Sequence, residues 1–208
     1  MTIEEYISDH SDVEPEYLAQ INRLTHQTLI NPRMLSGHLQ GRVLSMFCKM
    51  IQPIRILELG TYVGYSALCM AESLPENGVL HTVECDDELE DFIVDNFAKS
   101  EYGKKIILHI GDALQVINEF DDCFDLVFID ADKRDYTAYY EAIMPKLKQG
   151  GFIIADNTLW DGKVLRPVEN NDKHTIEIIR FNDYVVNDER VEEVMLPLRD
   201  GLTIIRKK

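Results

Sequence analysis

The sequence predicts an α/β fold: a doubly wound, mostly parallel sheet of seven strands with an antiparallel C-terminal hairpin and an N-terminal helical cap. From residue 54 onward, five short β-rich runs alternate with stretches of helical period. Such alternation is typical of a parallel sheet with helices on both faces. Two further apolar runs are separated only by Arg199-Asp200-Gly201, and this spacing favours an antiparallel hairpin at the sheet edge.

The first 50 residues are expected to form the helical cap. They contain two stretches of helical period, separated by the turn-rich segment NPRMLSG. The positions that share one face are Tyr17, Ile21, Leu24 and Thr28 in the first helix, and Leu39, Val43, Met46, Phe47 and Met50 in the second, at residues 37–50. Both stripes are compatible with core packing and with a contact between subunits.

The core is expected over residues 51–208, so that residues 1–208 form a single domain. Its parallel strands are predicted at residues 55–59, 79–84, 105–110, 124–130 and 151–156. Its helices are predicted at residues 65–73, 87–99, 113–119, 135–148 and 175–187. The strands of the hairpin are predicted at residues 191–198 and 201–207.

Composition and charge exclude several classes of protein. With 45% hydrophobic and 28% charged residues, the 208-residue chain has the composition of a soluble globular protein. No stretch approaches the roughly 20 apolar residues of a membrane span. The polar, acidic N-terminus is unlike a secretory signal, so a cytoplasmic location is expected. A net charge of −16 disfavours broad nucleic-acid binding, and four scattered cysteines without a CxxC pair are expected to be free thiols.

A glycine turn follows the first predicted strand. Open α/β sheets bind ligands beyond the carboxyl ends of their strands, where the strand order reverses. Gly60 and Gly64 would let the backbone approach a ligand closely and turn sharply into the next helix. Ser66 lies in the first turn of that helix, where a hydroxyl can meet an anionic group.

The next two strands end in acidic residues. Glu84 lies about 20 residues beyond the glycine turn, a position from which a carboxylate accepts both hydrogen bonds of a ribose diol. After the third strand, Asp112 could accept from an adenine amino group while the amide of Ala113 donates to the ring. Together with the glycine turn, these residues predict an adenosine pocket.

Glu58 and Tyr62 indicate which adenosine cofactor is bound. A dinucleotide site requires G-x-G-x-x-G, but the position two residues after Gly60 holds Tyr62, whose ring would fill the space of a pyrophosphate. Glu58 would repel phosphate but suits the ammonium group of an amino acid. These residues favour S-adenosylmethionine. An NAD-binding oxidoreductase is the alternative outside methyl transfer.

Polar residues also end the fourth and fifth strands. If these strands are neighbours, Asp130, Asp156 and Asn157 converge at one rim. Two carboxylates and an amide form an oxygen-only set that suits Mg²⁺, or another divalent cation such as Ca²⁺ or Mn²⁺. The alternative is an ordinary turn after an ordinary strand-end acid. Lys133, three residues beyond Asp130, is either a general base or a surface lysine.

A methyl donor beside a divalent cation predicts methyl transfer to a hydroxyl group. A phenol, with a pKa near ~10, is a poor nucleophile at neutral pH. Two adjacent hydroxyls that chelate a cation would lose a proton more readily, Lys133 would remove it, and the oxygen would attack the methyl group in line.

Four motifs make the chain recognisable: ELGTYVGYSAL, FIDADKRDYTAYY, DNTLWDGKV and MLPLRDGLTIIRK. They closely resemble the cation-dependent O-methyltransferases of the caffeoyl-CoA and catechol type, from about residue 34 to the C-terminus. The resemblance implies one Rossmann-like, class I S-adenosylmethionine-dependent methyltransferase domain, and commonly a homodimer. It also implies metal ligands at Asp130, Asp156 and Asn157, with Lys133 as the catalytic base.

The resemblance further implies contacts to both substrates. The implied donor contacts are Met34, Glu58, Gly60, Tyr62, Ser66, Glu84, Asp112, Ala113 and Asp130. Tyr136 and Trp160 resemble residues that line the mouth for the acceptor, although packing would explain each equally well. The implied acceptor is a catechol-like or other vicinal-diol aromatic small molecule. The family also resembles enzymes that methylate a hydroxylated uridine in tRNA, which is the alternative acceptor.

Overall fold

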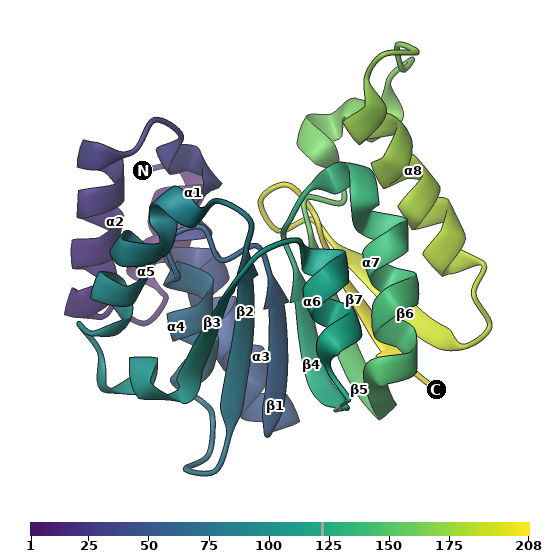
Figure 1. Ribbon diagram of the computed structural model, residues 1–208. Helices are drawn as coiled ribbons and strands as arrows, with labels where there is room; N and C mark the ends of the chain where they lie inside the picture. The colour runs from purple at the N-terminus through teal and green to yellow at the C-terminus, as the bar shows by residue number, and fades with distance from the viewer. Residues whose placement is uncertain (122) are drawn as a thin grey trace.

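A seven-stranded sheet runs through the centre of the protein, in the order β3-β2-β1-β4-β5-β7-β6 (Figure 1). The computed structural model describes residues 1–121 and 123–208. The strands are β1 Arg55–Leu59, β2 Val79–Glu84, β3 Ile106–Ile110, β4 Phe124–Ile129, β5 Leu147–Asp156, β6 Val191–Leu196 and β7 Leu202–Lys207. β1 to β5 pair in parallel, and β7 runs antiparallel to both β5 and β6. The predicted fold class and the C-terminal hairpin are therefore confirmed.

The sheet is covered by helices on both faces (Figure 1). The α-helices are α1 Ile3–Asp9, α2 Glu16–Thr28, α3 Gly37–Ile51, α4 Tyr65–Ala71, α5 Glu90–Phe97, α6 Ala113–Glu119, α7 Tyr136–Ile143 and α8 Lys173–Val186. The shorter 3₁₀ helices are η1 Pro32–Met34, η2 Asp87–Leu89, η3 Glu101–Lys105, η4 Lys133–Asp135, η5 Met144–Lys146 and η6 Trp160–Leu165. None of the helices in the described chain is long and apolar enough to cross a membrane.

Two apolar clusters pack against the two faces of the sheet. Helices α6, α7 and α8 contribute to one cluster, and α2 to α5 contribute to the other. Leu57 and Leu59 of β1 join the first cluster and Ile56 joins the second, because side chains alternate between the faces of a strand. The inner strands β1 and β4 are thus buried on both sides, which explains why they are mainly apolar runs in the sequence.

The face that α3 buries is not the one that its apolar stripe predicts. Met46 and Met50 are 50% and 73% exposed, and the buried side chains instead include Gln40, Leu44 and Ser45. The helix turns this face inward because it approaches α4 closely: a Cβ added at Gly41 would lie 2.7 Å from the Sγ of Cys69. The buried polar side chains find partners there, so the burial of polar atoms is offset.

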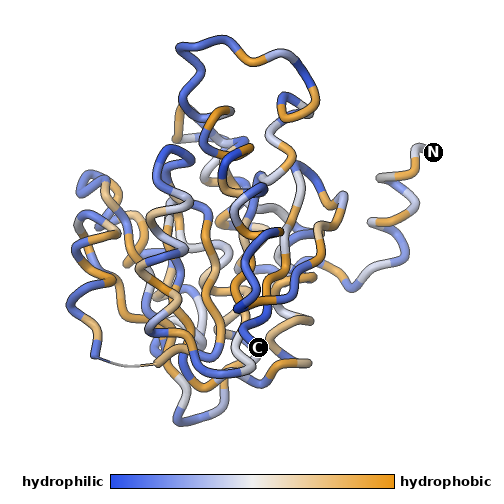
Figure 2. Tube along the Cα trace, turned by 90° about the vertical axis from the view of Figure 1, so that its right-hand side faces the viewer, coloured by the Kyte–Doolittle hydropathy of each residue, from blue (hydrophilic) through white to orange (hydrophobic). Residues whose placement is uncertain are grey.

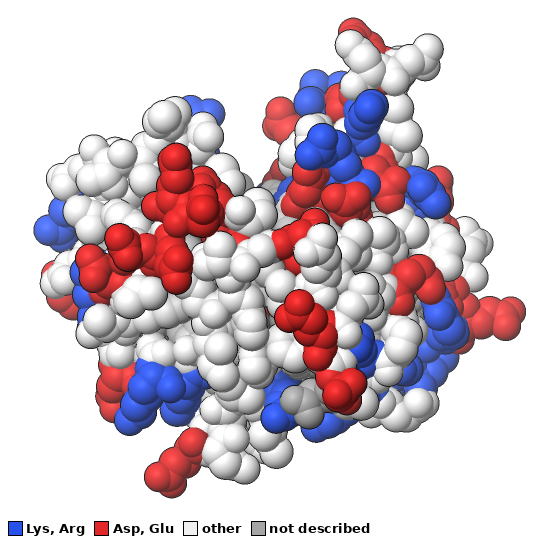
Figure 3. All heavy atoms as spheres, viewed as in Figure 1, with Lys and Arg blue, Asp and Glu red and all other residues white. Residues whose placement is uncertain are grey.

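α1 stands apart from the rest of the chain (Figure 2). A capping box between Thr2 and Glu5 begins the helix, and the apolar side chains of Ile3 and Tyr6 are 75% and 53% exposed. On the surface shown in Figure 3, acidic side chains gather over the region of α5, whose first turn carries Glu90 and Asp91. All four cysteines are free, as predicted.

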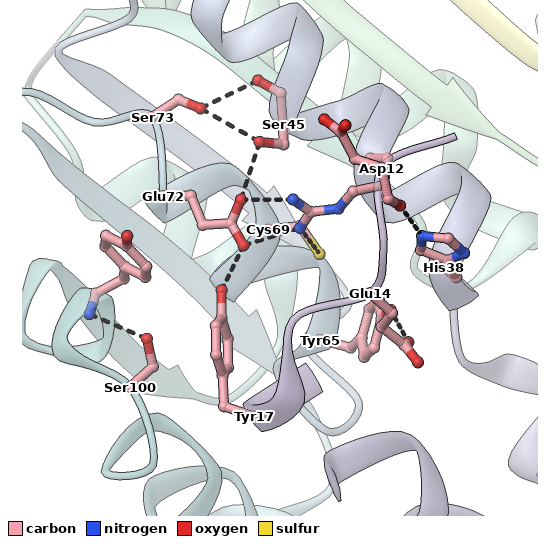
Figure 4. A network of polar contacts seen from close by, with 12 residues as sticks. Asp12, Glu14, Tyr17, His38, Ser45, Tyr65, Cys69, Glu72, Ser73 and Ser100 are labelled. Carbon is pink, nitrogen blue, oxygen red and sulfur yellow. Dashed lines mark hydrogen bonds and ion pairs between the residues drawn. The ribbon is translucent and has the colours of Figure 1, made fainter. Parts of the chain in front are cut away.

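A polar network joins the cap to the core beneath α3 (Figure 4). The Glu72 carboxylate accepts two hydrogen bonds from Arg42, at 2.8 and 2.9 Å, and one from the hydroxyl of Tyr17. Burial alone would raise the pKa of Glu72, but these hydrogen bonds outweigh it and lower the pKa. Nearby, the His38 ring donates to the carbonyl of Asp12 at 2.6 Å. On α4, the hydroxyl of Tyr65 donates to the carboxylate of Glu14, so the segment before α2 is tied to both α3 and α4.

Candidate active site

A cavity of about 1150 Å³ opens at the carboxyl ends of the parallel strands. Residues that follow β1, β3 and β4, together with the last residues of β2 and β5, line it. The loop at residues 30–36, which leads into α3, forms a further part of the wall. Because β1 lies between β2 and β4, the cavity is at the point where the strand order reverses, the usual ligand site of an open α/β sheet.

The glycine turn after β1 brings the backbone close to the neighbouring strand. Gly60 has φ +96°, and a Cβ at this position would overlap the carbonyl oxygen of Asp130. Tyr62 also has a positive φ, of 50°, and its amide donates to Oε2 of Glu84 at 2.7 Å. Gly64, with φ +81°, precedes α4. The turn therefore packs against Asp130 on one side and holds Glu84 on the other.

The Glu84 carboxylate is fixed entirely by backbone amides. Besides the amide of Tyr62, the amides of Cys85 and Asp86 donate to Oε1 at 2.9 and 3.0 Å. A carboxylate has about four acceptor positions, so one position on Oε2 is available to a ligand. Asp112, the N-cap of α6, accepts from the amide of Gln115 at 2.9 Å through Oδ1 alone. Both acids line the cavity, as do Ala113, Tyr62 and Ser66.

Glu58 lies beneath the cavity and does not line its wall. Its side chain is fully buried, and Oε2 accepts from the hydroxyl of Thr82 at 2.5 Å. Oε1 is buried and has no hydrogen-bond partner within the described chain. Burial raises the pKa of Glu58 to about 8, because the charged form is poorly solvated. An unsatisfied carboxylate oxygen below the glycine turn is suited to a cationic or hydrogen-bond-donating group.

The rim residues Asp130, Asp156 and Asn157 line the same cavity, as the strand order predicts. Asp156 is 4% exposed, and its Oδ1 accepts from the amide of Asn157 at 2.8 Å. Burial, and then the negative charge of Asp130, raise the pKa of Asp156 to about 6. Two carboxylates that repel one another beside an amide oxygen match the donor set of a hard divalent cation. Among the described residues, no three histidine, cysteine or acidic side chains group around a metal position.

Lys133 is paired with Asp130. Its Nζ lies 2.7 Å from Oδ1 of Asp130 and 5.1 Å from the centre of the Tyr136 ring, and the residue is 8% exposed. Burial alone would lower the pKa of Lys133, but the negative charge of Asp130, together with contacts to Asp130 and Tyr136, outweighs burial and raises the pKa. The lowered pKa expected of a general base is therefore not found while Asp130 pairs with Lys133.

Comparison with known proteins shows the family to which the chain belongs. A family model described as O-methyltransferase matches residues 8–208. The chain belongs to the S-adenosylmethionine-dependent O-methyltransferases. The alternative of an NAD-binding oxidoreductase is thereby set aside.

Relatives of this methyltransferase match it over nearly its whole length. A caffeoyl-CoA O-methyltransferase of Petroselinum crispum is 32% identical over 205 residues, which cover 93% of this chain and 85% of the relative. Catechol O-methyltransferase domain-containing protein 1 of Mus musculus is 34% identical over 209 residues, which cover 98% and 79%. The structure of an O-methyltransferase from Bacillus cereus in complex with SAH is 26% identical, with a TM-score of 0.91 and coverage of 99% and 97%.

The two residues expected at the acceptor mouth of the methyltransferase differ in position. Trp160 lines the cavity, with its ring centre 6.0 Å from that of His174. Tyr136 does not: it is fully buried, and its hydroxyl donates to the carbonyl of Asp156 at 3.0 Å. Tyr136 therefore belongs to the core, and Tyr139, one helical turn later, lines the cavity. Met34, 57% exposed, lies on the cap side of the cavity.

Three polar residues near Asp156 and Asn157 were not predicted from the sequence to belong to the site. Gln40 of α3 donates to Oδ2 of Asp156 at 2.6 Å, and Arg199 of the β6–β7 connection contacts Gln40 at 3.3 Å. Asp200 accepts from the side chain of Asn157 at 3.4 Å. A lone glutamine in a helix carries no signal of its own, and Arg199-Asp200 suggests only a turn.

Proposed function

We propose that this methyltransferase transfers the methyl group of S-adenosylmethionine to a hydroxyl of a catechol-like or other vicinal-diol aromatic small molecule, with a divalent cation, Mg²⁺, at the rim. The proposal rests on one observation: the residues predicted to bind adenosine line the same cavity as the three predicted cation ligands, Asp130, Asp156 and Asn157. A cavity of about 1150 Å³ has room for a nucleoside and a small acceptor together.

The donor would lie along the ends of β1, β2 and β3. Glu84, held by three amides, would accept from a ribose hydroxyl at its remaining position on Oε2, and Asp112 with Ala113 would meet the adenine. The turn from Gly60 to Ser66 would contact the amino-acid part of the donor, with Glu58 beneath the turn. Met34 would contact the donor from the cap. The Bacillus cereus relative, whose structure is in complex with SAH, supports S-adenosylmethionine as the donor.

Asp130, Asp156 and Asn157 would hold the cation, which when bound supplies Lewis-acid polarisation of the acceptor hydroxyl. Lys133 would take the hydroxyl proton at Nζ. Its burial favours the neutral amine, and its interactions with Asp130, and then with Tyr136, oppose this. When Asp130 shares that charge with a ligand, the opposition weakens and Lys133 becomes a better base.

The acceptor would enter between Trp160 and Tyr139, two aromatic side chains on the cavity wall. The names of the Petroselinum and Mus relatives support a catechol-like acceptor. Hydroxyuridine in tRNA has no such support, because neither relative is named for tRNA and the chain carries a net charge of −16.

Transfer of a labelled methyl group to a catechol panel and to undermodified tRNA, side by side, tests the proposal. We expect labelled catechol, loss of activity with EDTA and recovery with Mg²⁺. Asp156→Ala should abolish turnover while SAH still binds. If EDTA left activity unchanged, the proposed role of the cation would be wrong. If only tRNA were labelled, the acceptor would be tRNA and not a catechol.

We also infer that residues 1–208 form one domain that acts as a homodimer in the cytoplasm. The exposed Met46 and Met50 of α3, with the apolar side of α1, are the surfaces suited to a contact between copies. Light scattering on the purified chain would give the mass of a monomer if this inference is wrong.

A further inference from the structure

Gln40 is a buried amide between the cation rim and the C-terminal hairpin. It is 1% exposed and lies on α3, in the cap. Its Nε2 donates to Oδ2 of Asp156 at 2.6 Å, and its Oε1 accepts from Nη1 of Arg199 at 3.3 Å. Three segments far apart in the sequence therefore meet at one side chain.

The chemistry of these partners fixes how the amide is oriented. An arginine guanidinium only donates hydrogen bonds, so Arg199 can meet only the oxygen of the Gln40 amide. The NH₂ group must then face Asp156, whose Oδ2 is left as an acceptor. Arg199 is itself held in place, because the same Nη1 donates to the carbonyl of Ser36, directly before α3.

Both oxygens of Asp156 are consequently held from the protein side. Gln40 binds Oδ2, and the amide of Asn157 binds Oδ1. A hydrogen bond to each oxygen fixes the plane of the carboxylate and directs its remaining lone pairs. Groups that orient a metal ligand in this way typically change metal affinity 10–100-fold, an order-of-magnitude range.

We infer that Gln40 is a positioning residue that holds Asp156 ready for a divalent cation, and that Arg199 acts on Asp156 through Gln40. The inference rests on the proposed cation site. It also assigns a role to Arg199 of the β6–β7 connection, which meets Asp156 through Gln40 on α3.

Cation and donor affinities of the full chain, measured separately, test the inference. Mn²⁺ binding is followed by electron paramagnetic resonance and SAH binding by calorimetry. Gln40→Met keeps the length of the side chain and removes both hydrogen bonds. We expect Mn²⁺ affinity to fall about 10–100-fold and SAH affinity to stay within about twofold. Gln20→Met, on the exposed side of α2, is the matched control and should change neither.

Arg199→Met, on the connection between two strands, tests the second step with little risk to folding. It should weaken Mn²⁺ binding less than Gln40→Met does. The Gln40→Met/Arg199→Met double variant should bind Mn²⁺ as tightly as Gln40→Met alone. Unchanged Mn²⁺ affinity in Gln40→Met, or an equal loss of SAH affinity, would overturn the inference. Additive losses would overturn the role of Arg199.

The same measurements separate this inference from the proposed function. If the wild type binds Mn²⁺ and Asp156→Ala does not, the cation site stands and Gln40→Met decides the inference. If the wild type does not bind Mn²⁺, the cation site is wrong, and the positioning role is wrong with it.

Discussion

At the scale of single residues, Lys133 can be distinguished from the cation ligands beside it. Lys133→Met removes the proposed proton acceptor but also frees Oδ1 of Asp130, to which Nζ donates at 2.7 Å. We therefore expect turnover to fall about 10²–10⁴-fold while Mn²⁺ affinity does not decrease. Methyl transfer at saturating cation and Mn²⁺ titration measure the two effects.

The matched control for Lys133 is Lys148→Met, which breaks a lysine–aspartate pair of the same length, 2.7 Å, far from the cavity. It should leave turnover unchanged. If Lys133→Met retained wild-type turnover, Lys133 would be a structural partner of Asp130 and no base.

Glu58 should make the stability of the protein depend on pH. Its pKa rises from 4.5 to about 8 in the folded state. Between these values the folded chain keeps a proton that the unfolded chain has lost, so the free energy of unfolding falls as pH rises through this window. Glu58→Gln removes the titration, and its stability relative to the wild type should increase from pH 4.5 to pH 8 and then level off.

Urea unfolding of Glu58→Gln and of the wild type across this range, without donor, measures the effect. A difference in the free energy of unfolding that is the same at every pH reflects the exchange of side chains and does not bear on the prediction. Parallel pH profiles would show that Glu58 titrates near its ordinary value.

At the scale of elements, the glycine turn after β1 packs against Asp130 and also lines the cavity, so a change in its backbone should affect both stability and donor binding. Gly60→Ala would place a Cβ against the carbonyl oxygen of Asp130. We expect a loss of stability of about 3 kcal/mol and a marked loss of SAH affinity, because β1 and β4 must separate. Thermal unfolding and calorimetry measure the two losses.

Gly162→Ala is the control for the turn, because Gly162 also has a positive φ, of 66°, but the nearest atom to an added Cβ is 3.9 Å away. This variant should lose only the roughly 1 kcal/mol of the strained backbone. If the two variants behaved alike, backbone strain and not contact with Asp130 would explain the requirement for glycine.

Elements were predictable from the sequence where local pattern and tertiary environment agree. α6 has the predicted bounds, Ala113–Glu119, because its cap and its apolar positions lie within seven consecutive residues. The helix predicted at 135–148 instead ends at Ile143, because Pro145 cannot continue it and β5 already begins at Leu147. On α3 the apolar stripe misleads, because contact with α4 selects the face with Gly41.

At the scale of the whole molecule, topology explains how much of the site could be predicted. Strand ends in a parallel sheet meet at one edge, so residues as distant as Glu84 and Asp156 could be placed in one cavity from their positions after strands. Gln40 could not, because its partner Asp156 is 116 residues away and belongs to another layer. For Tyr136 the sequence left the acceptor mouth and core packing open, because a motif position does not reveal which way a helix turns its side chains; in the structure this side chain is buried.

The attachment of the cap to the core gives a prediction for the entire chain. Arg42 and Glu72 are 16% and 10% exposed, and Arg42→Met would leave the Glu72 charge nearly buried and unpaired. We expect the free energy of unfolding to fall by about 3 kcal/mol, and the Arg42→Met/Glu72→Met double variant to recover part of it, because no charge is then stranded. Since the cap loop at residues 30–36 lines the cavity, Arg42→Met should also weaken SAH binding.

Arg206→Met is the control for this pair, because Arg206 bonds Glu192 at a similar 2.7 Å but both side chains are about half exposed. Because solvent screens this exposed pair, Arg206→Met should lower the free energy of unfolding by less than about 1 kcal/mol and leave SAH affinity unchanged. Urea unfolding and calorimetry on the three variants and the wild type measure the loss of stability and the loss of SAH affinity. If Arg42→Met lost stability without any loss of SAH affinity, the cap would be held on the core by this network without shaping the donor site, and other contacts of the loop before α3, such as those from Tyr62 and Arg199, would set its position.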